Sequence, residues 1–272
     1  MAIIKAVPHF EVQVKVGDSV ANEWPMPADD TNVSETPSIS KYIESETGAR
    51  ISIQLSQYPG YTLPEGADRL GIKIYVDGEQ WETLEMKIQK HGCTETLGER
   101  IFRMHDGEYI KQYPIFSNII SDEEADLARV EADKLLIKKL GKIEVVLSAF
   151  RARGFCDPDE GFDNIGHVSN SEVSHKAMIT SGEHLSHRIC PEDVHIEEEY
   201  IPYPVLDCVF VEDIAKYHFQ YSSHRPMIGE RGFALPAALS PLGTPRLLPQ
   251  HRYPETQQPG GIPCIDLTQD ED

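Results

Sequence analysis

Strict alternation of apolar and polar residues runs through the first half of the chain, and it restricts the folds open to this sequence. The pattern repeats in residues 10–16, 51–55, 72–76 and 84–88. Successive side chains of a β-strand point to opposite faces, so each apolar set lines one face of a sheet. The pair Asp77–Gly78 lies between the last two segments and supplies the positive φ angles of a hairpin turn. These segments predict strands with one buried face.

The same reading predicts further strands at residues 101–104, 108–116, 142–151, 205–211 and 216–221. Many short strands separated by turns indicate an antiparallel β-sandwich, so the expected fold class is mainly β. One α-helix is expected at about residues 122–140. Ser121 is its expected N-cap, Glu124 completes a capping box, and Gly141 ends it.

The chain divides by composition into a folded part and a tail. Residues 1–225 contain all the predicted strands and form the expected β-rich domain. Residues 226–272 have no periodicity, and prolines without backbone donors recur through them. These are Pro226, Pro236, Pro241, Pro245, Pro249, Pro254, Pro259 and Pro263. We therefore expect a disordered C-terminal tail without regular helix or sheet.

Charge and cysteine usage limit the partners and the compartment. The chain has 25 Lys and Arg against 45 Asp and Glu, a net charge of −20, which repels nucleic acid and anionic membrane surfaces. No apolar stretch approaches the roughly 20 residues of a membrane span. The five cysteines are odd in number and form no C-x-x-C pair. We expect an intracellular protein of the nucleus or cytoplasm with reduced thiols and no cofactor.

Six short segments, in order along residues 1–225, resemble a family of uncharacterised fungal proteins that share a domain of unknown function. They are Pro8-His9-Phe10-Glu11-Val12-Gln13-Val14, Lys41-Tyr42-Ile43-Glu44, Ile74-Tyr75-Val76-Asp77-Gly78, Gly141-Lys142-Ile143-Glu144-Val145, Leu185-Ser186-His187 and Tyr217-His218-Phe219-Gln220-Tyr221-Ser222-Ser223. The resemblance implies a β-rich domain and an intracellular fungal origin, and it brings no activity, cofactor or catalytic residue. Ser222-Ser223-His224 departs from the family, where an Arg is expected, which argues against an anion-binding role there.

Two clusters have the residue types of metal sites. His184, His187, Cys190 and His195 offer imidazole and thiolate ligands suited to zinc, although a second cysteine pair is missing. Residues 157–164 group acidic side chains as calcium loops do, but Gly161 and Phe162 break the EF-hand pattern. For both clusters we favour a solvated polar loop and expect no stoichiometric metal.

The chain lacks the local signatures of known catalytic families, including G-x-S-x-G, G-x-G-x-x-G, H-E-x-x-H and the Walker A loop. We therefore expect a non-enzymatic protein. Two alternatives stay open: an enzyme of unrecognised type, and a carbohydrate-binding or small-ligand-binding sandwich. Trp24, Trp81 and the eleven tyrosines could line such a ligand face, although aromatic residues more often pack in the core.

The end of the tail has the most specific pattern. Ile265-Asp266-Leu267-Thr268 resembles the core of a SUMO-interacting motif, a short aliphatic run around one acidic position followed by acids. Cys264 stands where Val or Ile is usual. The residues expected to bind a partner are Cys264, Ile265, Asp266, Leu267, Thr268, Asp270, Glu271 and Asp272. We predict binding to SUMO or a SUMO-modified protein by strand addition; the alternative is a merely solubilising acidic end.

Overall fold

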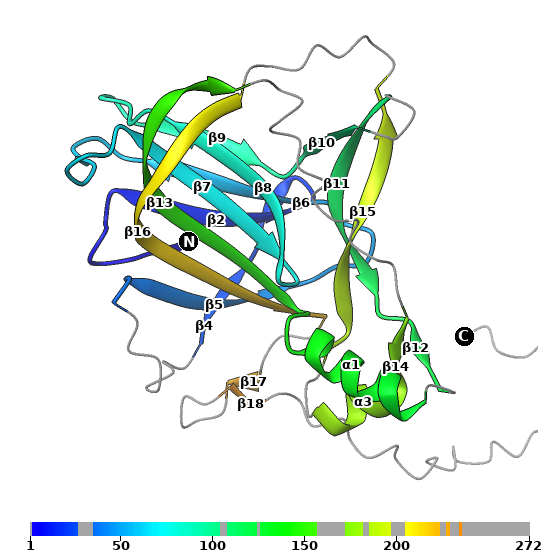
Figure 1. The fold of residues 1–272 in the computed structure, drawn as a ribbon. Helices are drawn as coiled ribbons and strands as arrows, with labels where there is room; N and C mark the ends of the chain where they lie inside the picture. The colour runs from blue at the N-terminus through cyan, green and yellow to red at the C-terminus, as the bar shows by residue number, and fades with distance from the viewer. Residues whose placement is uncertain are drawn as a thin grey trace, which may run out of the picture. The chain divides into compact units, whose positions relative to one another are not determined.

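The computed structural model describes residues 2–26, 35–103, 108–123, 126–156, 172–181, 185–196, 205–223, 227–228 and 234–235 (Figure 1). The chain divides into two units, Met1–Pro236 and Ala237–Asp272, and all of the described residues belong to the first. None of the helices in these described residues is long and apolar enough to cross a membrane.

The largest sheet has six strands, and its central strands are the longest of the fold. Its order is β4 (Glu23–Pro25), β5 (Ser38–Glu44), β16 (Val205–Ser222), β13 (Lys142–Cys156), β7 (Arg69–Val76) and β8 (Glu79–Met86). Neighbouring strands are antiparallel except for β5 and β16, which run parallel. This pair is an exception to the predicted antiparallel order, because β5 is joined to its partner through most of the chain and not by a hairpin.

A second sheet packs against the first through their apolar faces. It contains β1 (Ala2–Ile3), β2 (Phe10–Val16), β6 (Ile51–Gln57) and β9 (Cys93–Leu97), with β3 (Ser19–Val20) paired to the end of β2. Phe10 and Val12 of this sheet share one buried cluster with Ile72, Tyr217 and Phe219 of the large sheet. The alternation of apolar residues therefore produces the two-layered core that it predicted, and the mainly β fold class is confirmed.

Smaller elements adjoin the sandwich (Figure 1). A third sheet contains β10 (Arg100–Arg103), β11 (Tyr109–Asn118) and β15 (His187–His195). A helical part combines α1 (Leu127–Ile137) and α3 (His175–Ser181) with the parallel pair β12 (Ser121–Asp122) and β14 (Val173–Ser174). The last pair is β17 (Met227–Ile228) with β18 (Ala234–Leu235).

The predicted single helix is corrected in its bounds and in number. Helix α1 begins after Asp126, whose side chain accepts a hydrogen bond from the Arg129 N–H at 2.8 Å, whereas Ser121 pairs with Val173 in a strand. Asp126 serves as the cap because it directly precedes the helix, and the helix ends three residues before the predicted position 140. The second helix, α3, is only seven residues long, too short for its period to be recognised.

Other corrections concern strands that lack alternation. Strand β5 was not predicted, and β15 lies in a segment interpreted as a polar loop, because polar residues occupy many positions of both strands. Residues 205–211 and 216–221 form one strand, β16, since irregular pairing interrupts its periodicity without ending it. Within the predicted tail, β17 and β18 pair in the proline-free stretch between Pro226 and Pro236.

One buried carboxylate connects several of these elements. Asp77, in the β7–β8 turn, has φ 52° and only 5% exposure. Its Oδ1 accepts hydrogen bonds from the Gly141 N–H and the Tyr221 hydroxyl at 2.8 and 2.7 Å, and its Oδ2 accepts from the Ile189 N–H at 2.8 Å. Burial raises the pKa of Asp77 to about 6, against the opposing effect of these donors.

We predict that Asp77→Asn lowers the free energy of unfolding at pH 7 by about 2 kcal/mol. Asn tolerates the positive φ. Its NH₂ group, however, replaces the Oδ2 acceptor and lies against the Ile189 N–H, so two buried donors face each other without an acceptor. Urea unfolding measures the effect. Asp18→Asn, at an exposed turn, is the control and should stay within roughly 0.5 kcal/mol of the native protein. Equal stability of the two variants would contradict the role of Asp77.

The pH dependence of this effect has a defined sign. The folded pKa of Asp77, about 6, lies above its ordinary value of 3.8, so the folded state binds the proton more tightly. The associated stability is fully present below about pH 4 and is lost as the pH rises through about 6. The stability difference between the native protein and Asp77→Asn should therefore shrink between pH 4 and pH 8, by about 2 kcal/mol. A stability difference that grows between pH 4 and pH 8 would contradict the raised pKa of Asp77.

Candidate binding site

A cavity of about 630 Å³ lies beside the middle of β16. Four segments line it: Ala6 and Val7 from the β1–β2 connection, residues 35–37 before β5, Tyr61 from the β6–β7 connection, and residues 210–214 of β16. Its volume falls within the range of roughly 300–1,000 Å³ that is typical of ligand pockets.

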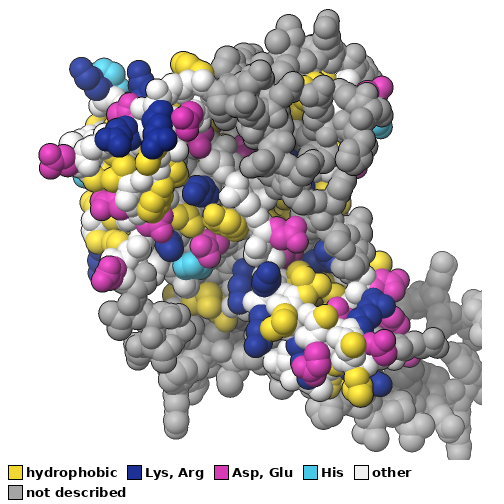
Figure 2. All heavy atoms as spheres, in the orientation of Figure 1, with side chains coloured by type: hydrophobic (Ala, Val, Ile, Leu, Met, Phe, Trp, Pro, Cys, Tyr) yellow, Lys and Arg dark blue, Asp and Glu magenta, His cyan; other side chains and the backbone are white. Residues whose placement is uncertain are grey.

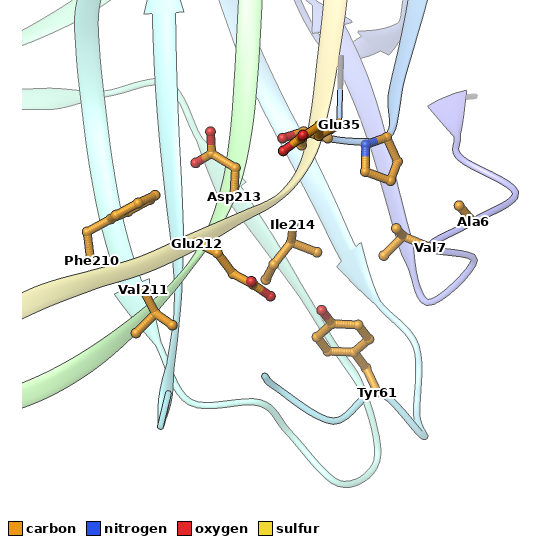
Figure 3. Close-up of a pocket in the computed structure, with 11 residues that line it drawn as sticks. Ala6, Val7, Glu35, Tyr61, Phe210, Val211, Glu212, Asp213 and Ile214 are labelled. Atoms are coloured by element: carbon orange, nitrogen blue, oxygen red, sulfur yellow. The ribbon is translucent and has the colours of Figure 1, made fainter. Parts of the chain in front are cut away.

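Irregular pairing in β16 shapes the cavity. Against β13, the register shifts between Leu147 and Ser148 and again between Ala149 and Phe150, each time leaving one extra residue on β16. Such bulges redirect the side chains of a strand. Figure 3 shows the result: Glu212 and Ile214 point to the side of β16 on which Tyr61 and Val7 lie, whereas Phe210 and Asp213 point to the other side.

The cavity has an apolar floor and an acidic rim. Val7 and Ile214 are 8% and 7% exposed, whereas Glu35 and Glu212 are exposed and have no ion pair among the described residues. The pKa of Tyr61 is raised by burial and by the charge of Glu212. No Lys, Arg or His stands among the described lining residues. The local potential is therefore negative, which favours a cationic ligand.

Asp213 differs from the two rim glutamates because it is bound within the protein. Its Oδ1 accepts a hydrogen bond from the Ser148 hydroxyl at 2.8 Å, and its Oδ2 lies 3.1 Å from the Lys216 ammonium. These contacts fix the backbone between the two bulges of β16. Asp213 therefore supports the shape of the cavity, and Glu35 and Glu212 supply its unpaired charge.

The exposed face of the large sheet continues from the cavity. The Lys73 Nζ lies 5.2 and 6.0 Å from the ring centroids of Phe150 and Phe210, within the range of cation–π contacts. Phe210 is 53% exposed. Figure 2 shows hydrophobic side chains lying among charges of both signs over the described surface. This face of the sheet is therefore amphipathic and accessible. Strand β16 contributes side chains to this face and to the cavity.

A serine and a histidine meet elsewhere, at the junction of β5, β11 and β15. The Ser45 Oγ is 3.0 Å from His187 Nδ1, and the Thr47 Oγ1 is 2.7 Å from Nε2. The Thr47 hydroxyl donates to Asn118 Oδ1, so Nε2–H donates to Thr47. Nδ1 is then the acceptor, and the hydroxyls of Ser45 and Ser186 lie 3.0 and 3.1 Å from it. Ser45 and His187 are each 5% exposed. This buried pair therefore joins the segment after β5 to β15.

This structural role predicts a stability effect. Ser45→Ala should lower the free energy of unfolding by about 1 kcal/mol, because the Nδ1 acceptor loses one buried hydrogen bond. Ser19→Ala, at an exposed position of β3, is the matched control and should be neutral. Thermal unfolding monitored by circular dichroism compares them. If both variants unfold at the same temperature as the native protein, the hydrogen bond contributes nothing to stability.

The structure separates the described members of the predicted zinc cluster. His187, Cys190 and His195 all lie on β15, where His187 and Cys190 point to opposite faces. Eight residues of strand place His187 and His195 about 26 Å apart. His184 lies outside the described residues, as do the acidic segment 157–164 and all of the predicted partner-binding residues, 264–268 and 270–272.

The predicted aromatic ligand face does not include Trp81. Its side chain is 1% exposed, its Nε1–H donates to the Gly98 carbonyl at 3.2 Å, and the Arg100 guanidinium lies 4.1 Å from its ring centroid. Trp81 therefore packs in the core beside a buried cation. Tyr61, one of the eleven tyrosines named as candidates, does line the cavity, although the sequence did not single it out. Phe210 was not predicted, because the cavity is assembled from four distant segments. The one sequence signal is the loss of alternation at residues 209–214, where the bulges lie.

Comparison with known proteins bears on the folded part. A family model described as a domain of unknown function (DUF7918) matches residues 9–230. Searches of curated proteins and of solved structures find no match. The matched range covers every element of the sandwich except β1, and it includes the cavity segments from residue 35 onward.

Proposed function

We propose that this chain, which belongs to the DUF7918 family, is a non-enzymatic protein-binding or scaffold module whose C-terminal tail binds SUMO or a SUMO-modified partner. The observation that carries the proposal is the sequence Ile265-Asp266-Leu267-Thr268, followed by Asp270, Glu271 and Asp272. The fungal origin and the nuclear or cytoplasmic location suggested by the sequence belong to the same proposal.

The chemistry of the segment suits strand addition. Side chains at i and i+2 of an extended chain point the same way, so Ile265 and Leu267 enter one apolar groove while Asp266 faces solvent. The terminal acids then meet Lys or Arg at the rim of the partner, which sets orientation and association rate. The short segment becomes ordered on binding, so its affinity is weak, with a Kd on the order of 10–100 μM.

The proposal predicts a specific loss of binding. NMR titration of labelled SUMO with a peptide of residues 258–272 should shift the groove resonances, and the Ile265→Ala, Leu267→Ala double variant should abolish the shifts. A peptide with Ile262→Ala is the control, because this residue lies outside the core and should keep nearly native affinity. Unmoved resonances at millimolar native peptide, or equal shifts with the double variant, would refute the motif.

Phosphorylation of Thr268 should strengthen the same interaction. Glu271 stands three residues after Thr268, a spacing that acidophilic kinases favour, and a phosphate adds a charge of about −1.5 to −2 near the basic rim. We expect the phosphopeptide to bind about threefold to tenfold more tightly at low salt. Isothermal titration at two salt concentrations measures this. Weaker binding of the phosphopeptide would place Thr268 against an apolar or acidic surface.

A second candidate function is favoured by the cavity beside β16. Its volume, apolar floor and acidic rim suit a ligand-binding sandwich, the alternative that the sequence left open. The two functions are compatible, because the cavity residues and the terminal motif are different parts of the chain.

A further inference from the structure

We propose that the open edge of β16, together with the adjoining cavity, binds an extended basic peptide of another protein. This inference concerns the folded domain and does not depend on the tail motif. It joins three observations on the described residues: a strand edge without a strand partner, a cavity that straddles this edge, and acidic side chains without ion pairs along it.

The first observation is the unequal pairing of β16. On one side, β13 pairs with β16 along nearly its whole length, from Val205 to Gln220. On the other side, β5 pairs only with Lys216–Ser222. No described strand pairs with residues 205–215 on that second side, and Figure 1 shows β13 and β16 continuing together beyond β5. Within the described part of the chain, this stretch of β16 therefore has a strand partner on one side only, and its other edge can accept a further strand.

The second observation is the position of the cavity. Phe210 and Asp213 lie on one side of β16 and Glu212 and Ile214 on the other, yet all four line the same cavity. A space lined from both faces of one strand lies along the edge of that strand. A peptide bound to this edge would therefore place alternate side chains toward Phe210 on one face and toward the Val7 floor on the other.

The third observation is the charge along this edge. Asp207 and Glu212 on β16 and Glu35 just before β5 are exposed, and none of them forms an ion pair among the described residues. The arginines of β13, Arg151 and Arg153, lie one strand further from the edge. The aliphatic stem of a lysine or arginine fits the apolar floor, and its cationic head reaches Glu35 or Glu212.

The same features argue against a second copy of this chain as the occupant. Two β16 edges would bring Glu212 and Asp207 of both copies together, which is unfavourable for like charges. The bulges beside Val211 and Ile214 also bend the edge, and bent edges resist regular pairing of two long strands. A short peptide needs only the stretch before the bulges and one side chain in the cavity.

The test is an NMR titration of the ¹⁵N-labelled full-length chain with an acetylated and amidated peptide of eight residues that alternates arginine with valine. We expect shifts at the amides of residues 205–214 and slower hydrogen exchange there. Glu35→Gln with Glu212→Gln should weaken binding roughly threefold to tenfold. Glu44→Gln with Glu46→Gln, at exposed positions outside the cavity, controls for the change in net charge and should bind normally.

Three further peptides or ligands decide between occupants. A peptide with glutamate in place of arginine and a peptide with proline at alternate positions should not bind, because the first lacks the charge and the second lacks backbone donors. Equal shifts with arginine amide alone would overturn strand addition. Shifts confined to residues 262–272 would overturn the edge as the site. Concentration-dependent dimers in sedimentation velocity, with protected β16 amides and no peptide, would assign the edge to a second copy.

Discussion

The Asp77 carboxylate joins parts of the chain that no local signal brings together. Its partners Gly141, Ile189 and Tyr221 are 64, 112 and 144 residues away along the chain. Through them the β7–β8 turn is attached to the start of β13, to β15 of the third sheet and to the end of β16. A buried carboxylate with four donors tolerates little displacement, because each donor would otherwise lack a partner.

This attachment also fixes one end of β16. Its C-terminal end is fixed by the Tyr221 hydroxyl and by the parallel pairing with β5, so residues 216–222 are held on both sides. Its N-terminal half follows β13 alone and carries two bulges. Among the described strands, β16 thus changes from a central strand to an edge strand along its own length. The cavity, the exposed Phe210 and the unpaired acids all lie where this change occurs.

The sequence predicted those parts of the fold that depend on local pattern. Alternation identified β2, β6, β7 and β11, and the Asp77–Gly78 pair identified a turn in which both residues have positive φ. Alternation did not identify β15, because polar residues occupy many positions of this strand and leave no apolar period. For the same reason His187 and Cys190 were interpreted as loop residues. The cavity could not be predicted, since its residues become neighbours only when the sandwich closes.

Binding is the common theme of the two proposals, and both describe it as the addition of one strand to another. The measurement that tests the central claim most directly compares the Kd of SUMO for the full-length chain with its Kd for the isolated peptide of residues 258–272. If function lies in the terminal motif, the two values agree within about twofold. Binding by the full chain without binding by the peptide would contradict the account, because it would place the SUMO site on the folded domain.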